Sequence, residues 1–336
     1  MDEQSAMTSP ESEFELTQAV WTNAVINTEQ VDPFSSSPAW QLAFHEAFNP
    51  ARRLLIERTS DSVICFAENF FSPSEIFLTP IEPHWFFGCP LLGNDAVDLF
   101  AMIMPFLAVE YAPHFPRILI SGIPMRSTLP ERLVQSFADS FTIRLHSVGL
   151  QCAASLEDDM DGFLSRRSAG FRKNLRQVVR RATDRGVYFE RVIPRTLEEA
   201  QTAYSRLIAV EHASWKGLNS CGMTESPIKE FYAAMTRRML RHGDARIIMA
   251  RYDEEDIGYI FGGLIGNIYR GLQFSYDDKW RNYSIGNLMQ HEKIRWLVEE
   301  GIVRYDMGSV LGESMSYKAN WTEERIPYQC WILEKR

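Results

Sequence analysis

The chain has 336 residues, which corresponds to about two domains of ordinary size. Its hydrophobic fraction of 45% and charged fraction of 24% are typical of a globular protein and argue against wholesale disorder. The net charge of -9 argues against a general attraction to nucleic acid or to an anionic membrane, although a local basic surface is compatible with it.

The five cysteines are far apart and include no CxxC pair and no Cys/His cluster at metal-binding spacing. Residues 1–15 are acidic and polar, unlike a secretory signal, and we expect them to form a flexible tail. The most apolar stretch, residues 99–109, is too short to span a bilayer and is typical of a buried helix. We therefore expect a cytoplasmic protein with reduced thiols, no metal and no membrane partner.

Two halves of the chain repeat one order of elements: helix, hairpin, strand, loop, helix, strand. The first copy runs from Pro38 to Ile123 and the second from Pro227 to Val310. Letter-by-letter identity between the copies is weak, so the element order carries this inference. It predicts an α/β fold with mixed sheets, duplicated in tandem. We place the domains at residues 16–155 and 156–336.

A strongly basic segment, residues 163–186, lies between the copies. Six residues recur in it at helical spacing and predict a buried stripe, which comprises Leu164, Ser168, Phe171, Leu175, Val178 and Ala182. Arg172, Arg176 and Arg180 step by four and share another face. This face is either a solvated cationic surface or a contact for phosphate, from a cofactor or from RNA.

The segment from Ser275 to Gly301 places Arg281, Ser284 and Gly286 between a predicted strand and a predicted helix. The first N–H groups of a helix lack partners, and the helix dipole adds positive charge there. Such a loop suits a pyrophosphate group. Many helices also begin after a polar loop without binding anything, so the loop alone leaves both interpretations open.

In its context this loop resembles the motif R/Q-x-x-G-x-G/A of the GNAT acyltransferase superfamily, with Ser284 in place of the first glycine. The resemblance implies that coenzyme A binds here through the residues Phe274, Ser275, Arg281, Ser284, Ile285, Gly286 and Asn287.

A second resemblance covers about Phe163 to Trp321 and is to the FemAB-like, or CelD/BcsL-type, acetyltransferase branch. Five segments carry it in order: FRKNLRQVVRRATDRG, EHASWKG, FSYDDKWRNYSIGNLM, YDMGS and MSYKANW. The branch implies two GNAT-like folds in one chain, the first of them degenerate. The corresponding loop of the first copy, CPLLGND, lacks an arginine, and we expect no cofactor there.

Amide formation requires a proton acceptor, a stabilised oxyanion and good positioning, without a metal. Glu211 is the first candidate base, and Asp306 ends a strand beside the expected site. Lys318 is a candidate to neutralise a substrate anion or to polarise the acyl carbonyl. Tyr276 is a candidate proton donor to the leaving thiolate. Each has a structural alternative. Glu211 is then a helix-end carboxylate and Asp306 a buried hydrogen-bond acceptor. Lys318 is then an exposed lysine and Tyr276 a packing residue.

Trp215, Lys216 and Tyr317 are the candidate substrate-binding residues. The sequence thus favours an N-acyltransferase that joins an acyl group from acyl-CoA to an amine of a small molecule or amino sugar in a ternary complex. Two alternatives stay open. In the first, the donor is an aminoacyl-tRNA, as in FemAB-like proteins, and tRNA is a partner. In the second, the fold is a scaffold that binds without catalysis.

Overall fold

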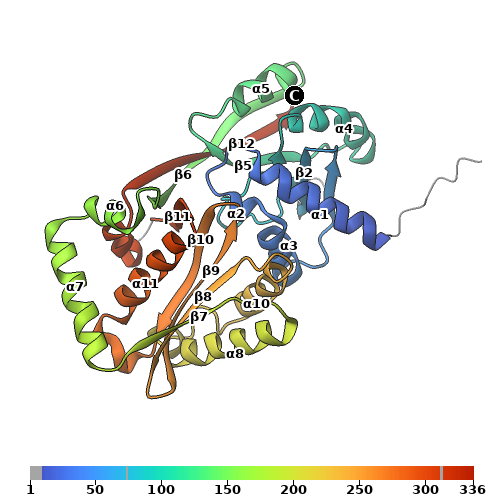
Figure 1. Ribbon diagram of the computed structural model, residues 1–336. Coiled ribbons are helices and arrows are strands. Elements are labelled where there is room, and N and C mark those ends of the chain that lie inside the picture. Colours follow the sequence, from blue (N-terminus) through green and yellow to red (C-terminus); the bar gives the residue numbers. More distant parts are fainter. Residues whose placement is uncertain (1–9, 73–74, 311–312) are drawn as a thin grey trace, which may run out of the picture. The chain divides into compact units, whose positions relative to one another are not determined.

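The computed structural model describes residues 10–72, 75–310 and 313–336 (Figure 1). The chain separates into two compact units, each assembled from more than one segment. Unit 1 comprises the described parts of residues 1–42, 51–148 and 328–336, and unit 2 comprises the described parts of residues 43–50 and 149–327. Two strands, β6 (Phe141–Ser155) and β12 (Glu324–Lys335), contribute residues to both units.

These boundaries differ from the predicted ones. The chain passes from unit 1 to unit 2 within β6 and not after it, residues 43–50 belong to unit 2, and residues 328–336 return to unit 1. They return because β12 pairs with β5 (Arg117–Pro124) in antiparallel fashion, with Trp331 opposite Ile120. The predicted tail of residues 1–15 differs too: helix α1 (Pro10–Ile26) begins at Pro10, and residues 1–9 lie outside the described part.

Unit 1 contains a sheet with the strand order β1-β2-β3-β5-β12, and β4 pairs with β2. Its other strands are β1 (Leu54–Arg58), β2 (Val63–Ser72), β3 (Glu75–Pro80) and β4 (Leu91–Leu92). Its other helices are α2 (Pro33–Ser36), α4 (Ala96–Glu110) and α5 (Leu129–Phe137), and α3 (Pro38–Phe48) begins here and ends in unit 2. Only one face of α4 is buried, with Leu99 and Phe100, whereas Phe106 and Val109 are exposed.

Unit 2 contains a sheet with the order β6-β11-β10-β9-β8-β7. Its other strands are β7 (Tyr188–Val192), β8 (Ala245–Tyr252), β9 (Glu255–Ile265), β10 (Ile268–Tyr276) and β11 (Arg304–Ser309). Its helices are α6 (Asp159–Ser165), α7 (Ala169–Asp184), α8 (Leu197–Ala213), α9 (Trp215–Leu218), α10 (Ile228–Met239) and α11 (Ile285–Glu299). Two 3₁₀ segments, η1 (Asp278–Tyr283) and η2 (Glu313–Asn320), precede α11 and follow β11.

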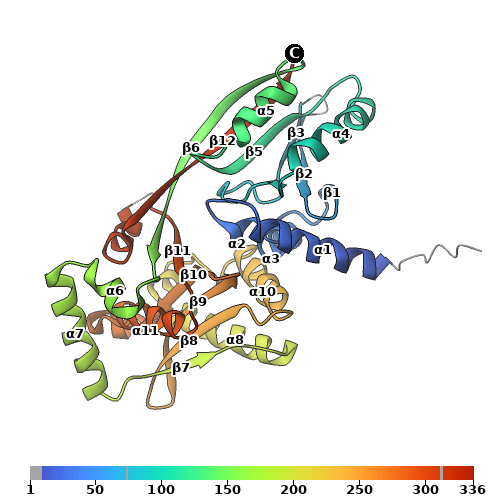
Figure 2. The same ribbon diagram turned by 45° about the horizontal axis from the view of Figure 1, so that its top comes forward.

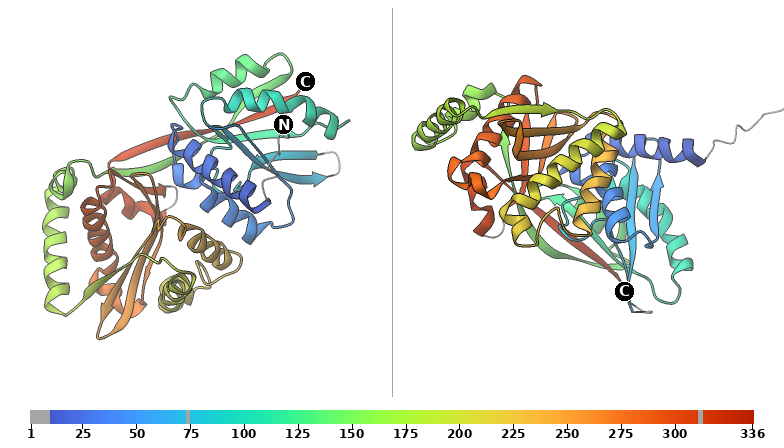
Figure 3. Two further views of the ribbon diagram at one scale, coloured as in Figure 1. Left: turned by 45° about the vertical axis from the view of Figure 1, so that its right-hand side comes forward. Right: turned by 90° about the horizontal axis from the view of Figure 1, so that it is seen from below.

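Helices cover both faces of this sheet, with α11 on one face and α8 and α10 on the other (Figure 3). The alternation of β9 explains the arrangement, because neighbouring side chains of a strand point to opposite faces. Ile260 belongs to the buried cluster around α11, whereas the Tyr259 hydroxyl donates a hydrogen bond to Glu211 of α8. The predicted buried stripe of α7 is confirmed for Leu175, Val178 and Ala182, whereas Ser168 is exposed and caps the start of the helix.

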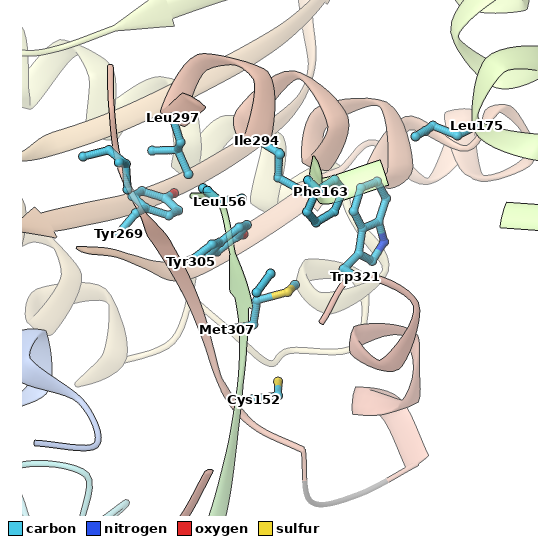
Figure 4. Packing of buried hydrophobic residues seen from close by; sticks show 12 residues of the cluster. Cys152, Leu156, Phe163, Leu175, Tyr269, Ile294, Leu297, Tyr305, Met307 and Trp321 are labelled. Carbon is cyan, nitrogen blue, oxygen red and sulfur yellow. The ribbon is translucent and has the colours of Figure 1, made fainter. Parts of the chain in front are cut away.

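The core beside β11 is aromatic (Figure 4). Tyr269 of β10 and Tyr305 of β11 meet edge to face with ring centroids 4.9 Å apart, and Phe163 stacks on Trp321 at 6.4 Å. Met307 packs in the same cluster. The first residues of β10 and β11 are therefore held together by a rigid core.

Both units contain the same parallel crossover, as the repeated element order predicts (Figure 2). In unit 1, α4 links the parallel strands β3 and β5, and in unit 2, α11 links the parallel strands β10 and β11. The tandem duplication is therefore confirmed at the level of topology. None of the described helices combines the length and apolar character needed to cross a bilayer.

Candidate functional site

Strands β10 and β11 are paired over only three positions, from Ile268 opposite Arg304 to Arg270 opposite Asp306. Beyond Arg270 the pairing stops. A register shift in β10 between Gly271 and Gln273 marks the same place. Such irregularities bend a strand and re-aim its side chains. The two neighbouring strands therefore separate in the middle of the sheet, and backbone groups on the facing edge of β10 lose their partner strand.

A pocket of about 360 Å³, here called the central pocket, lies at this separation. Residues 271–276 of β10 form one wall, and Tyr305 and Met307 of β11 form another. Trp215 and Lys216 line it from the α9 side, Gln290 from α11, and Tyr317 and Lys318 from η2. The central pocket thus combines aromatic walls with a few polar groups, as expected of a small-molecule site.

Two lysines supply the charge of the central pocket. The Lys318 Nζ donates to the Ser309 carbonyl oxygen at 2.6 Å, and burial lowers the pKa of Lys318 to about 8, with the charge of Arg270 acting in the same direction. The Lys216 Nζ donates to Gln273 Oε1 at 2.9 Å and to the Phe274 carbonyl at 3.0 Å. Burial also lowers the pKa of Lys216, and the negative charge of Glu211 opposes this shift. No carboxylate or histidine is among the described residues that line this pocket.

Glu211, the predicted base, lies behind the central pocket and not in its wall. Its carboxylate is completely buried and accepts hydrogen bonds from the Tyr259 hydroxyl at 3.0 Å and from the Met223 N–H at 3.1 Å. Its Oε1 is also 3.7 Å from the Lys216 Nζ. These partners make Glu211 a group that positions Lys216 and the loop at Met223.

Asp306, the second predicted carboxylate, is also buried and does not line the central pocket. The Arg304 Nε donates to its Oδ1 at 2.6 Å. A register shift between Asp306 and Gly308 follows it in the pairing of β11 with β6. Asp306 is an internal residue of β11 and not, as the sequence had suggested, its last one, so the placement suits a carboxylate that holds Arg304 within the strand.

The start of α11 has the geometry that the loop motif predicts. Ser284 takes a left-handed conformation with φ of 59°, and its side chain makes no capping hydrogen bond. The N–H groups of Ile285, Gly286 and Asn287 have no acceptor within the helix because they belong to its first turn. A Cβ on Gly286 would lie 3.2 Å from the Phe274 ring, so glycine keeps this approach open.

Arg281 is exposed, and its guanidinium lies 3.8 Å from the Asp278 carboxylate. It lines neither the central pocket nor a second pocket of about 240 Å³ on the other side of the loop. We call this second one the lateral pocket. It lies between α7, η1 and α11, and its lining comprises Val178, Arg181, Ala182, Arg185, Val187, Trp280, Asn282, Tyr283, Ser284, Ile285 and Leu288.

The basic segment around α7 divides into structural and exposed cations. The Arg172 guanidinium donates to the Arg167 carbonyl at 2.7 Å, and the Arg167 guanidinium donates to the Trp321 carbonyl at 2.7 Å. Arg176 and Arg180 are exposed, and within the described parts of the chain no carboxylate lies within ion-pair distance of either. Arg172, Arg176 and Arg180 line a groove with His291 of α11.

The structure thus brings seven of the predicted residues together. Trp215, Lys216, Phe274, Ser275, Tyr276, Tyr317 and Lys318 line the central pocket. Gln273, Gln290, Met307 and Met315 line it too and were not predicted from the sequence. Gln273 lies beside the predicted Phe274 in the same strand, and this neighbouring position was the signal that could have identified it. Nothing in the sequence singled out Gln290, whose Oε1 accepts from the Tyr305 hydroxyl at 2.8 Å.

Several solved structures share this fold at low sequence identity, which shows the fold alone. FemX matches with a TM-score of 0.66 and 9% identity, covering 93% of this chain and 95% of its own. A conserved protein of unknown function from Bacteroides thetaiotaomicron matches at 0.62 and 11%, covering 94% and 97%. L-PGS from Bacillus licheniformis matches at 0.54 and 11%, covering 89% and 91%.

No curated protein sequence matches the chain significantly. Residues 169–319 match the model of the acetyltransferase (GNAT) domain, and this range contains the separated strands, the start of α11 and Lys318. Residues 169–319 are therefore similar in sequence to the acetyltransferase domain of the GNAT superfamily.

Proposed function

We propose that this protein is an N-acyltransferase that moves an acyl group from acyl-CoA to an amine of a small molecule or amino sugar. The separation of β10 and β11, with the unpaired amides of α11 at one end, is the observation that carries the proposal. The amides at Ile285, Gly286 and Asn287 suit the pyrophosphate of coenzyme A, and the aromatic walls suit its uncharged arm.

The two reactants approach from opposite faces of the sheet in this proposal. Phe274 and Tyr276 pack toward α11 and would contact the donor, whereas Trp215 and Lys216 lie on the α8 side and would contact the acceptor. The donor supplies an activated thioester carbonyl. The amine nitrogen attacks this carbonyl directly, and the carbon–sulfur bond then breaks.

Lys318 is the residue that we assign to charge stabilisation. As an ammonium in a buried wall, it would stabilise negative charge on the acyl oxygen or on an anionic group of the acceptor. Tyr276 is the candidate proton donor to the thiolate. The amine proton would pass to water in the central pocket, because Glu211 and Asp306 lie behind it. We therefore assign Glu211 and Asp306 to positioning.

A product assay tests the proposal. The protein is incubated with acetyl-CoA and a panel of amino acids, amino sugars and their phosphates, and amide products are detected by mass spectrometry together with thiol release. We expect one class of amine to be acetylated, and Lys318→Met to lower the rate by about 100-fold. Coenzyme A binding without any amide product would contradict a transferase and favour a scaffold.

A second candidate replaces the donor by an aminoacyl-tRNA, as the resemblance to FemAB-like proteins implies. The exposed cations of α7, Arg176 and Arg180, favour it because they have no carboxylate partner within the described parts of the chain. Binding of tRNA would weaken steeply as salt rises, since phosphate contacts release counterions. Binding of acyl-CoA would depend on salt far less.

A further inference from the structure

The lateral pocket has an aromatic wall and an apolar floor. Trp280 and Tyr283 form the wall, with ring centroids 5.0 Å apart and an interplanar angle of 56°. Val178, Ala182 and Leu288 are buried beneath it. A flat aromatic group is the kind of ligand that such a surface binds, since stacked or tilted rings gain contact area with little loss of freedom.

The rim of the same pocket is cationic. Arg181 and Arg185 of the α7 segment line it, and both are exposed. The Arg185 guanidinium lies over the Tyr283 ring at 4.4 Å from its centroid. This cation–π contact places the guanidinium N–H groups beside the aromatic wall. In the described part of the chain, no carboxylate forms an ion pair with either arginine. Their charge is therefore available to an anionic ligand.

The loop before α11 connects the two pockets. Ser284 and Ile285 line the lateral pocket, while Gly286 faces Phe274 and Tyr276, which line the central pocket. A ligand with its bridging anion at the start of α11 would thus have one pocket on each side. One end would enter the separated strands, and the other would reach Trp280, Tyr283 and the two arginines.

We propose that the lateral pocket binds the nucleotide end of the donor, with its base against Trp280 and Tyr283 and its terminal phosphate beside Arg181 and Arg185. The inference rests on the proposed function, because the start of α11 must hold the donor's pyrophosphate. It adds the means by which the chain recognises a phosphorylated adenosine and distinguishes it from one that lacks the phosphate.

Calorimetric titration with coenzyme A and with dephospho-coenzyme A, which lacks the terminal phosphate, tests the inference. The wild type should bind coenzyme A about tenfold more tightly, and the double variant R181Q/R185Q should bind both equally. The matched control R176Q/R180Q removes the same charge from the same helix outside the lateral pocket, and it should keep the wild-type ratio. All four arginines are exposed, so these variants should fold.

The outcomes separate this inference from the proposed function. Equal wild-type affinity for the two compounds would contradict the nucleotide site in the lateral pocket, and so would an equal loss of coenzyme A affinity in both double variants. Neither result would contradict the proposed transferase function. Absence of binding to either compound overturns both. An RNA minihelix that ends in adenosine also presents an adenine base and phosphate groups, and it is titrated in parallel. If R181Q/R185Q weakens only the minihelix, the nucleotide comes from RNA.

Discussion

At the residue scale, the two carboxylates that the sequence singles out, Glu211 and Asp306, are both buried and lie outside the wall of the central pocket. A buried carboxylate needs hydrogen-bond partners, and those of Glu211 are Tyr259 and Met223, from separate segments of the chain. Residue type and its place at the end of an apolar helical run make Glu211 a candidate base. They do not distinguish a group that touches substrate from one that supports the groups that do.

The lowered pKa of Lys318 predicts how kcat/KM depends on pH. Its pKa of about 8 lies below the ordinary value of 10.5, so its ammonium is present below about pH 8 and is lost above it. If the cation stabilises developing charge, kcat/KM should fall by about tenfold per pH unit on this alkaline side. In Lys318→Arg the cation persists, so this decline should disappear.

The assay is thiol release from acetyl-CoA between pH 6 and 10, once an acceptor has been found. The acceptor must be deprotonated to attack, and its titration gives a separate rise on the acid side. An alkaline decline that is identical in wild type and Lys318→Arg would show that another group causes it. A rise through pH 8 that the arginine variant abolishes would instead make neutral Lys318 the base.

At the element scale, the basic segment, residues 163–186, shows which interactions the sequence pattern does not predict. The 3.6-residue period predicts the buried side of α7, including Leu175 and Val178. It does not predict that Arg167 is buried, because its partners Trp321 and Glu323 lie far along the chain. The same limit applies to β10: its strand pattern is clear, but its separation from β11 depends on a register shift that only the paired strands define.

Arg167 therefore supports a stability prediction. Its guanidinium donates to the Trp321 carbonyl at 2.7 Å and to Glu323 at 2.6 Å, and it lies 4.2 Å from the centre of the Phe163 ring. Arg167→Met should lower the free energy of unfolding by about 2–3 kcal/mol, because the Trp321 carbonyl loses its side-chain donor and Glu323 loses one of its cationic partners. Urea denaturation measures the change.

The matched control is Arg176→Met on α7, which removes the same charge from an exposed position nearby in the chain. This variant should change the free energy of unfolding by less than about 0.5 kcal/mol. Equal effects of the two substitutions would mean that total charge, and not the link to residues 321–323, is what Arg167 contributes.

At the scale of the whole molecule, element order predicts the duplication, because each copy supplies its own helix, hairpin, strand and crossover. What it does not predict is the discontinuity of unit 1, in which residues 328–336 pair with β5. The side chains that support this pairing, such as Glu334 with Arg117, lie more than 200 residues apart, so local sequence patterns do not reveal it. The same holds for β6, which continues from one unit into the other.

The central claim is that the open start of α11 holds the donor, and Gly286→Val tests it directly. Gly286 does not require a left-handed backbone, so valine keeps the helix while its side chain fills the space next to Phe274. Gly170→Ala is the control, because a Cβ there meets nothing within 4 Å. Calorimetric titration with coenzyme A should show binding by the wild type and by Gly170→Ala, and at least about tenfold weaker binding by Gly286→Val. Equal affinity in all three proteins, or no binding by the wild type, would contradict the account.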